Sequence, residues 1–360
     1  MRPKFSLKLL TPASLAIIAI PLMGFTGASG PAGEVAGGMP WWVEFIEKMF
    51  ILLTAATVAF GILHVEIELL HWVWITVRKR MKHVLGEPHP GKVVQSGGAN
   101  AAIPVKGVKR FDGHQRIQHV LLMSSFIVLA LTGITEKFYK STPFGGIIDA
   151  LGGFNNIRLI HRVAAGVMVF DGFYHLLYLT PGVLTLKKGM PQVKIGTWLE
   201  MVPSPKDVRD FTHAVSYLMG MRHDEPKFGK FTYIQKFDYW AVFWGLTVMA
   251  ISGAFMLFPA ISGHLAGTAG IAAALAAHSD EAILAMSWIL IVHMYNVHLG
   301  PRVFPFNPTI FTGRISAKLL ASEHQLQYEH FLVEQVAQAP TASSREYTSV
   351  ATKAPEQARR

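Results

Sequence analysis

The sequence predicts an all-α membrane protein with five transmembrane helices. Its composition is 51% hydrophobic and only 16% charged, which is typical of membrane proteins rather than soluble ones. Apolar segments of about 20 residues, the length that crosses a hydrocarbon core ~30 Å thick, recur along the chain. The basic residues behind the net charge of +10 lie in the segments between them. The charge therefore indicates membrane topology rather than nucleic-acid binding.

Residues 1–30 begin with basic residues, continue through an apolar run and end in small residues, as in a secretory signal peptide. Pro12 and Pro21 argue against a stable spanning helix at this place. An uncleaved N-terminal anchor is the alternative. In either case, the Gly- and Pro-rich linker that ends at Pro40 is expected on the outer side of the membrane.

Residues 41–80 are predicted to form an extra transmembrane helix ahead of the other four. Its apolar centre is followed by the basic run Arg78-Lys79-Arg80, and tryptophans near both ends fit the aromatic belts of a membrane helix. The later spans are expected at Gln115–Glu136, Ile157–Leu179, Tyr233–Phe258 and Ser279–Leu299, with a cytoplasmic tail over residues 303–360.

The basic residues also predict the orientation. Segments 78–116 and 181–232 contain nine and eight Lys or Arg residues, whereas segment 259–277 contains none. Because loops rich in Lys and Arg stay in the cytoplasm, segments 78–116 and 181–232 are both expected there. The chain is thus predicted to lie in a bacterial inner membrane, with a periplasmic N-terminus and a cytoplasmic C-terminus.

Histidines are the most informative residues of the spans. The chain has 16 of them, and histidine is costly in hydrocarbon unless it binds something. His161 and His175 are fourteen residues apart on the third span, and His278 and His293 are fifteen apart on the fifth. At ~100° per residue, each pair shares one helix face. The two spans run in the same direction, so the pairs match in depth.

Two helices with such histidine pairs predict haem irons that are ligated by one histidine on each face of the porphyrin. Imidazole suits iron, and two axial histidines leave no position for a substrate, so the implied chemistry is electron transfer across the bilayer. The absence of cysteine excludes iron–sulfur clusters and covalently attached c-type haem. The less specific interpretation is that these histidines bond neighbouring helices or interfacial water. His298 lies about 140° from His293 and is expected to point at a different neighbour.

Several other polar residues are candidates for a quinone site or a proton path. Glu66 and Glu68 lie between His64 and His71 at the end of the first span, where solvated interfacial side chains are the alternative. Asp171 lies in mid-span, where a lone carboxylate costs ~2.5–3.5 kcal/mol, so it is expected to be protonated, paired or part of a proton path.

The sequence resembles the cytochrome b (gamma) subunits of formate dehydrogenase and Ni–Fe hydrogenases. The motifs that carry the resemblance are Arg116…His119 with Leu131-Thr132-Gly133, Ile160-His161-Arg162, Gln235-Lys236 with Gly253, and His293-Met294-Tyr295. Bacterial cytochrome b/b6-domain membrane proteins are more similar still, through Tyr174-His175-Leu176-Leu177-Tyr178, Gln235–Trp240, His278–Ala282 and Val297–Pro301.

The resemblance implies a four-helix haem-binding bundle over residues 108–302 that holds two haems b. The outer haem is expected on His161 and His278, and the inner haem on His119 and His293, with His175 as the other inner candidate. A third inner haem on the spare histidine and His298 is left open. The separation of fifteen between His278 and His293 departs from the fourteen that is usual in the family.

The leading hypothesis is a b-type cytochrome of a respiratory chain that passes electrons between quinone or menaquinone and a periplasmic partner. That partner is expected to be a multihaem cytochrome c or a metalloenzyme with iron–sulfur subunits, so the chain is an electron-transfer subunit of a quinone-linked oxidoreductase complex. Asn296, Asp238, Glu66 and Glu68 are candidates for the quinone site. A haem-free anchor or assembly subunit is the main alternative, and a transporter is disfavoured by the lack of internal repeats.

Overall fold

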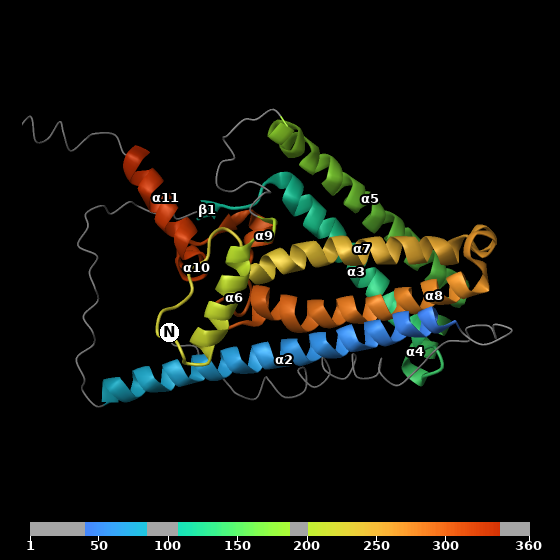
Figure 1. The fold of residues 1–360 in the computed structure, drawn as a ribbon, viewed down its shortest axis with the longest axis horizontal. Coiled ribbons are helices and arrows are strands. Elements are labelled where there is room, and N and C mark those ends of the chain that lie inside the picture. The colour runs from blue at the N-terminus through green and yellow to red at the C-terminus, as the bar shows by residue number, and fades with distance from the viewer. Residues whose placement is uncertain (1–39, 85–106, 188–200, 339–360) are drawn as a thin grey trace, which may run out of the picture.

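A computed structural model of the chain consists of long helices that run side by side, with short elements gathered at one end (Figure 1). The structure describes residues 40–84, 107–187 and 201–338. The predicted leader, residues 1–30, lies outside them. Five of the described helices are long and apolar enough to cross a membrane. The predicted all-α membrane fold is therefore confirmed.

The long helices follow the predicted spans closely except at one place. They are α2 (Trp41–Val84), α3 (Gly113–Lys137), α5 (Phe154–Lys187), α7 (Tyr233–Leu257) and α8 (Pro259–Ser287). The fifth span was expected to begin at Ser279, but α8 begins twenty residues earlier and bends at Gly267, which has φ 65°. Residues 268–277 are mostly alanine, the strongest helix former, and this propensity made a helix of the segment that was expected to be a loop.

Beyond Ser287 the last span continues as two π-helical segments, η3 (Trp288–His293) and η4 (Tyr295–Leu299). Such segments are rare, they close their hydrogen bonds from residue i to residue i+5, and they occur frequently at functional sites. Both segments lie where the predicted inner histidines are.

Capping boxes start two of the helices at the same end of the bundle. Asp112 accepts from the Gln115 backbone N–H at the start of α3, and Thr232 does the same for Gln235 at the start of α7. In each case the glutamine side chain also accepts from the cap residue's own N–H. These bonds satisfy backbone donors that the first helical turn leaves unpaired.

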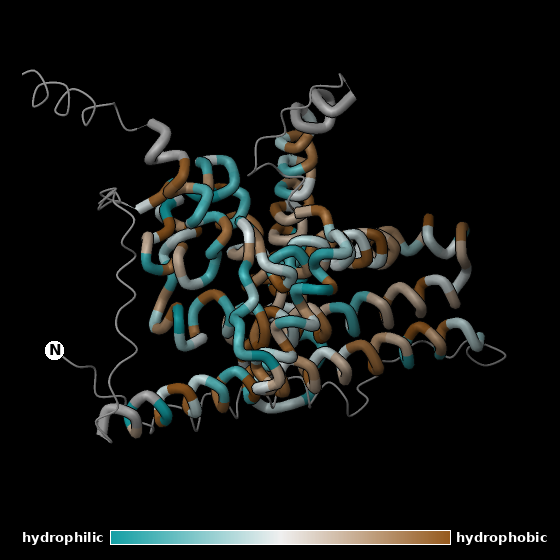
Figure 2. Tube along the Cα trace, turned by 60° about the vertical axis from the view of Figure 1, so that its left-hand side comes forward, coloured by the Kyte–Doolittle hydropathy of each residue, from teal (hydrophilic) through white to brown (hydrophobic). Residues whose placement is uncertain are grey.

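The helices pack as two pairs and one outside helix. α3 packs along α5, α7 packs along α8, and contacts between the two pairs are few. α2 packs along α8 and η3 from outside this four-helix bundle. Hydrophobic residues line the long helices, whereas hydrophilic residues gather over the short elements (Figure 2).

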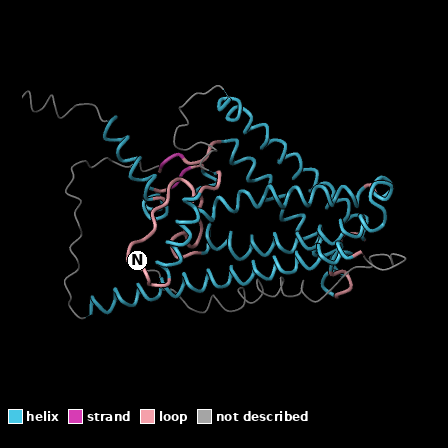
Figure 3. The backbone as a smooth tube through the Cα atoms, in the orientation of Figure 1, coloured by secondary structure: helices cyan, strands magenta, loops and turns pink. Residues whose placement is uncertain are grey.

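The short elements form what we call the cap, at the end of the bundle opposite α4 (Thr142–Ala150). They are α6 (Pro205–Leu218), α9 (Thr309–Thr312), α10 (Ala317–Glu323) and α11 (Gln325–Gln338). The cap also holds β1 (Val108–Lys109) and β2 (Arg314–Ile315), which pair antiparallel with Val108 opposite Ile315 (Figure 3). Of the tail expected over residues 303–360, the described part is thus folded, and it packs near the first residues of α3.

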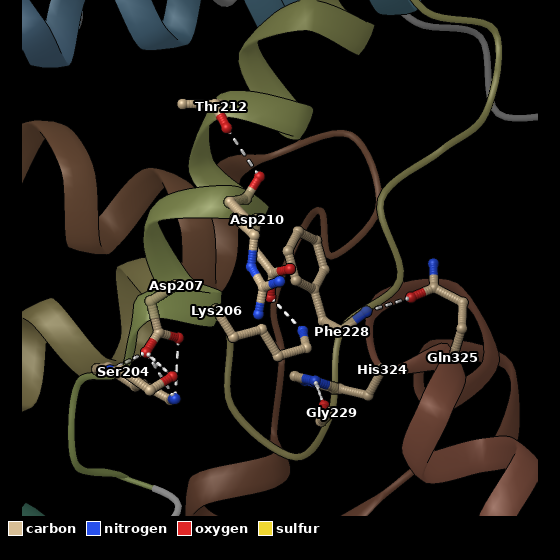
Figure 4. A network of polar contacts seen from close by, with 11 residues as sticks. Ser204, Lys206, Asp207, Asp210, Thr212, Phe228, Gly229, His324 and Gln325 are labelled. Carbon is tan, nitrogen blue, oxygen red and sulfur yellow. Dashed lines mark hydrogen bonds and ion pairs between the residues drawn. The ribbon is translucent and has the colours of Figure 1, made fainter.

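Buried polar contacts hold the cap together. Arg110 is 7% exposed and donates to the Gln327 side chain at 3.0 Å and to the Lys230 carbonyl. His324 is 3% exposed, and its Nδ1 donates to the Gly229 carbonyl at 2.8 Å (Figure 4). Burial, with the nearby Arg110 cation, lowers the pKa of His324 to about 3.

We expect the cap to lose stability on acidification. At pH values between the folded pKa and the unfolded pKa of ~6.5, the unfolded cap binds a proton at His324 and the folded cap does not. As the pH decreases through this range, the free energy of unfolding therefore decreases by at most ~1.4 kcal/mol per pH unit. Above pH 6.5 this dependence is absent, because the histidine is then neutral in both states. Protease susceptibility of α11 as a function of pH measures the effect. His324→Asn keeps a donor near Gly229 and is expected to flatten the profile; an unchanged profile in this variant would contradict the assignment.

Candidate functional site

The first histidine pair, His161 on α5 and His278 on α8, meets in the half of the bundle nearer α4. The two ring centroids are 6.2 Å apart, with 57° between the ring planes. They come from helices of different packing pairs, so they face each other across the interior where contacts between the pairs are few. A metal held midway between two imidazoles at ~2 Å from each nitrogen would place the centroids roughly 6 Å apart. The spacing therefore fits an iron with two axial histidines.

A hydroxyl from each of the other two helices holds one nitrogen of each ring. Thr132 Oγ1 of α3 lies 2.7 Å from His161 Nδ1, and Ser252 Oγ of α7 lies 3.0 Å from His278 Nδ1. Each hydroxyl already donates its proton to its own helix, Thr132 to the Val128 carbonyl and Ser252 to the Val248 carbonyl. Each can therefore only accept from the histidine. These bonds favour the tautomer with the proton on Nδ1 in both rings, in which Nε2 carries the lone pair that a metal would take.

Each of these hydroxyl residues is followed by a glycine that faces the same ring. A Cβ added to Gly133 would lie 3.6 Å from His161 Cε1, and one added to Gly253 would lie 3.3 Å from His278 Cε1. A larger residue at Gly253 would press on the ring, whereas a Cβ at Gly166 of α5 would meet open space. A hydroxyl residue followed by glycine thus occurs twice, on α3 and on α7, and both times beside a histidine.

The second histidine group lies toward the cap and consists of His119, His293 and His298. His293 Nδ1 donates to Asp238 Oδ2 of α7 at 2.9 Å, and the Trp288 indole donates to the other oxygen of the same carboxylate. Its Nε2 is again the free nitrogen. His119 of α3 lies within electrostatic range of both His293 and His298, and its Nδ1 is buried without a hydrogen-bond partner. A buried nitrogen in that state is expected where a bound group completes the site.

His298 contacts other residues than His293 does, and a different neighbour is what the azimuth of about 140° between them predicts. It lies on η4, which is π-helical. His298 stacks on Phe306 at 4.6 Å, and its Nδ1 accepts the Asn307 backbone N–H at 3.3 Å. Its remaining proton is therefore on Nε2.

His175 has protein partners for both ring nitrogens. Nδ1 lies 2.9 Å from Gln118 Oε1, and Nε2 lies 2.9 Å from the Tyr239 hydroxyl. The ring thus links α5 to α3 and α7. A metal at either nitrogen would have to displace one of these bonds.

The candidates of the first span divide into two sets. His64 and Glu68 lie on the side of α2 that faces η4, with His64 Nε2 3.5 Å from Asn296 Oδ1 and 3.8 Å from Glu68 Oε2. Glu66, two residues from each, is exposed. His71 stands apart, against the Tyr217 ring at 4.7 Å. Asp238 is committed to His293, as described above.

Two buried carboxyl groups remain without a full set of partners. Asp171 of α5 is 5% exposed and Glu281 of α8 is 3% exposed, and one oxygen of each has no hydrogen bond. Glu281 lies one turn from His278, with its Oε1 at 3.0 Å from the place of a Cβ on Gly245. The sequence analysis singled out Asp171 but missed Glu281, although a carboxylate inside an apolar span was the same signal.

The family model of prokaryotic cytochrome b561 matches residues 110–304. That stretch is more than half of the chain and contains α3, α5, α7, α8 and both histidine groups, but not α2. No curated protein gives a significant match. The match agrees with the resemblance found from the motifs, and the family implies haem b. The chain therefore belongs to the prokaryotic cytochrome b561 family and is a multi-pass membrane b-type cytochrome that functions in electron transfer.

Proposed function

We propose that the chain carries electrons between a membrane quinone and a redox partner on the periplasmic side, through two haems b. The observation that carries the proposal is the first histidine pair, whose rings face each other with both Nδ1 protons held and both Nε2 lone pairs free. Bound there, haem supplies reversible one-electron transfer. His161 and His278 would hold its iron from both sides, which leaves no position for a substrate.

For the second haem we propose His119 and His293 as ligands. His293 has a free Nε2 because Asp238 fixes its tautomer, and His119 has a ring nitrogen that no protein group satisfies. His175 is disfavoured because both of its nitrogens have partners. His298 is disfavoured because the Asn307 N–H occupies its Nδ1 and leaves Nε2 as a donor. We therefore assign to His298 a hydrogen bond toward a haem propionate or a quinone oxygen.

The two sites lie toward opposite ends of the bundle. His278 and His293 are fifteen residues apart on one continuous span, which corresponds to ~22 Å along the axis. The basic segments on the cap side support an orientation with the cap in the cytoplasm and the first pair near the periplasm of an inner membrane. Electrons then cross most of the bilayer within this one chain.

The partners follow from this orientation. At the α4 end, the described residues offer short connections and no large domain, so a soluble donor or acceptor must be another protein. A multihaem cytochrome c or a metalloenzyme with iron–sulfur subunits fits that role. The quinone site is proposed beside the second histidine group, where Asn296 and Glu68 lie close together.

Histidine variants test the ligand assignment. We expect His161→Ala and His278→Ala each to lose one haem, because a single imidazole is left on the iron, and His119→Ala and His293→Ala each to lose the other. His175→Ala is the control, matched in residue type and helix to His161, and is expected to keep both haems. A haem assay per chain measures the result. Loss of a haem in His175→Ala but not in His119→Ala would reverse the assignment of the second site.

The hydroxyls that hold the first pair give a second prediction. Thr132→Val and Ser252→Ala remove the acceptor of an Nδ1 proton, and lost outer partners of metal ligands typically cost ~10–100-fold in affinity. We expect weaker haem retention or a shifted midpoint potential at the first site alone. Thr135→Val is the control, because Thr135 is also buried on α3 and bonds its own helix. Equal effects of all three variants would show that the hydroxyls do not act through the histidines.

A further inference from the structure

α2 lies outside the family match, yet it packs tightly against the span that carries the second histidine group. Val58 of α2 shares a buried cluster with Ile291 and Val292 of η3. At Gly61 an added Cβ would lie 2.7 Å from Ile291 Cγ2, so a larger residue would force the Ile291 side chain or the helix to shift. This close packing fixes the rotation of α2. It directs the next turns, with His64 and Glu68, toward η4.

Side chains of α2 and η4 form a polar cluster at this place. His64 Nε2 lies 3.5 Å from Asn296 Oδ1 and 3.8 Å from Glu68 Oε2. The Tyr295 ring meets the His64 ring edge-on at 6.2 Å. Tyr295 is 6% exposed, and its hydroxyl faces Glu68 without a hydrogen bond of normal geometry. A buried hydroxyl left in that state points into a site that a further polar group can complete.

Charged groups of the cap lie within electrostatic range of Glu68. They are Arg302 and, on α10, Glu323. Arg302 pairs with Glu225 and lies 3.7 Å from Glu323. The Glu225 side chain is 40% exposed, so this charged group reaches the surface of the cap.

We propose that Glu68 and His64 of α2 are the proton-transfer pair of the quinone site, which makes the extra helix part of that site. The inference rests on the function proposed above. Reduction of one quinone to quinol takes up two electrons, which a haem held at the second histidine group would supply one at a time. It also takes up two protons, which form the two O–H bonds of the quinol. Glu68 and His64 pass these protons inward, and Glu323, Arg302 and Glu225 line the route from the cap. Quinol oxidation runs the same steps in reverse.

The chain offers a matched control on the same helix. Glu66 and Glu68 are two residues apart and identical in type, but Glu66 is exposed, whereas Glu68 faces the cluster. Glu68→Gln and Glu66→Gln each remove one carboxylate while keeping the side-chain size. Any effect of lost charge on helix insertion is therefore common to both variants.

The test uses full-length, haem-loaded protein and measures haem reduction by menadiol and by decylubiquinol. In Glu68→Gln we expect reduction to slow at least ~10-fold, because proton transfer by a positioned side chain contributes roughly 10²–10⁴-fold. The rate of haem reduction in the wild type is expected to depend on pH, and this dependence is expected to be lost in Glu68→Gln. Glu66→Gln is expected to keep the wild-type rate. Haem content and reduction by dithionite are expected to be unchanged in both.

A second readout does not depend on electron transfer. Photolabelling with an azidoquinone is expected to mark the peptide that contains His64 and Glu68, and an excess of menaquinone is expected to prevent it. If Glu68→Gln fails to retain haem, His64→Gln takes its place with the same expected loss of rate.

The outcomes separate the two proposals. A wild-type protein that neither quinol reduces overturns the proposed quinone function itself. If a quinol reduces the haem of the wild type, two results would overturn the role of α2 alone. One is a normal rate in the Glu68 or His64 variant, and the other is a photolabel confined to other helices.

Discussion

The first histidine pair depends on one constraint, which is that a hydroxyl within a helix has only one proton to give. Thr132 and Ser252 give theirs to the carbonyls of their own helices, so they must accept from the histidines. This fixes the Nδ1–H tautomer of both rings without any charged group in the membrane. Asp238 does the same for His293 with a carboxylate, near the cap. In each case a helix other than the ligand's own helix decides which nitrogen meets the metal.

The π-helical end of the last span is the second constraint. In the sequence, His293 follows His278 by fifteen positions, one more than is usual in related cytochromes. A π-helical turn takes up an extra residue without moving the rest of the helix. The π-helical segment η4 also carries Tyr295 and Asn296, whose side chains meet His64 of α2. The unusual spacing between His278 and His293 thus coincides with the π-helical segments that carry His293, His298 and the residues that contact α2.

The sequence predicted the fold class and the five spans, apart from the early start of α8, because hydropathy is a local signal. Helical periodicity, another local signal, named the histidines as candidate ligands. It did not predict which histidines are free to ligate. His175 and His161 look alike in spacing, and only the positions of Gln118, Tyr239 and Thr132 on other helices distinguish them. Glu66 and Glu68 are also equivalent in the sequence pattern, and only the packing of α2 at Gly61 shows which of them faces η4.

The most direct measurement of the central claim is the haem content and spin state of the purified full-length protein. If two pairs of histidines clamp two irons, a pyridine haemochrome assay should give two haems b per chain, and electron paramagnetic resonance should show both as low-spin, six-coordinate centres. A protein with no haem, with a single haem, or with a high-spin iron that has an open position would contradict the account.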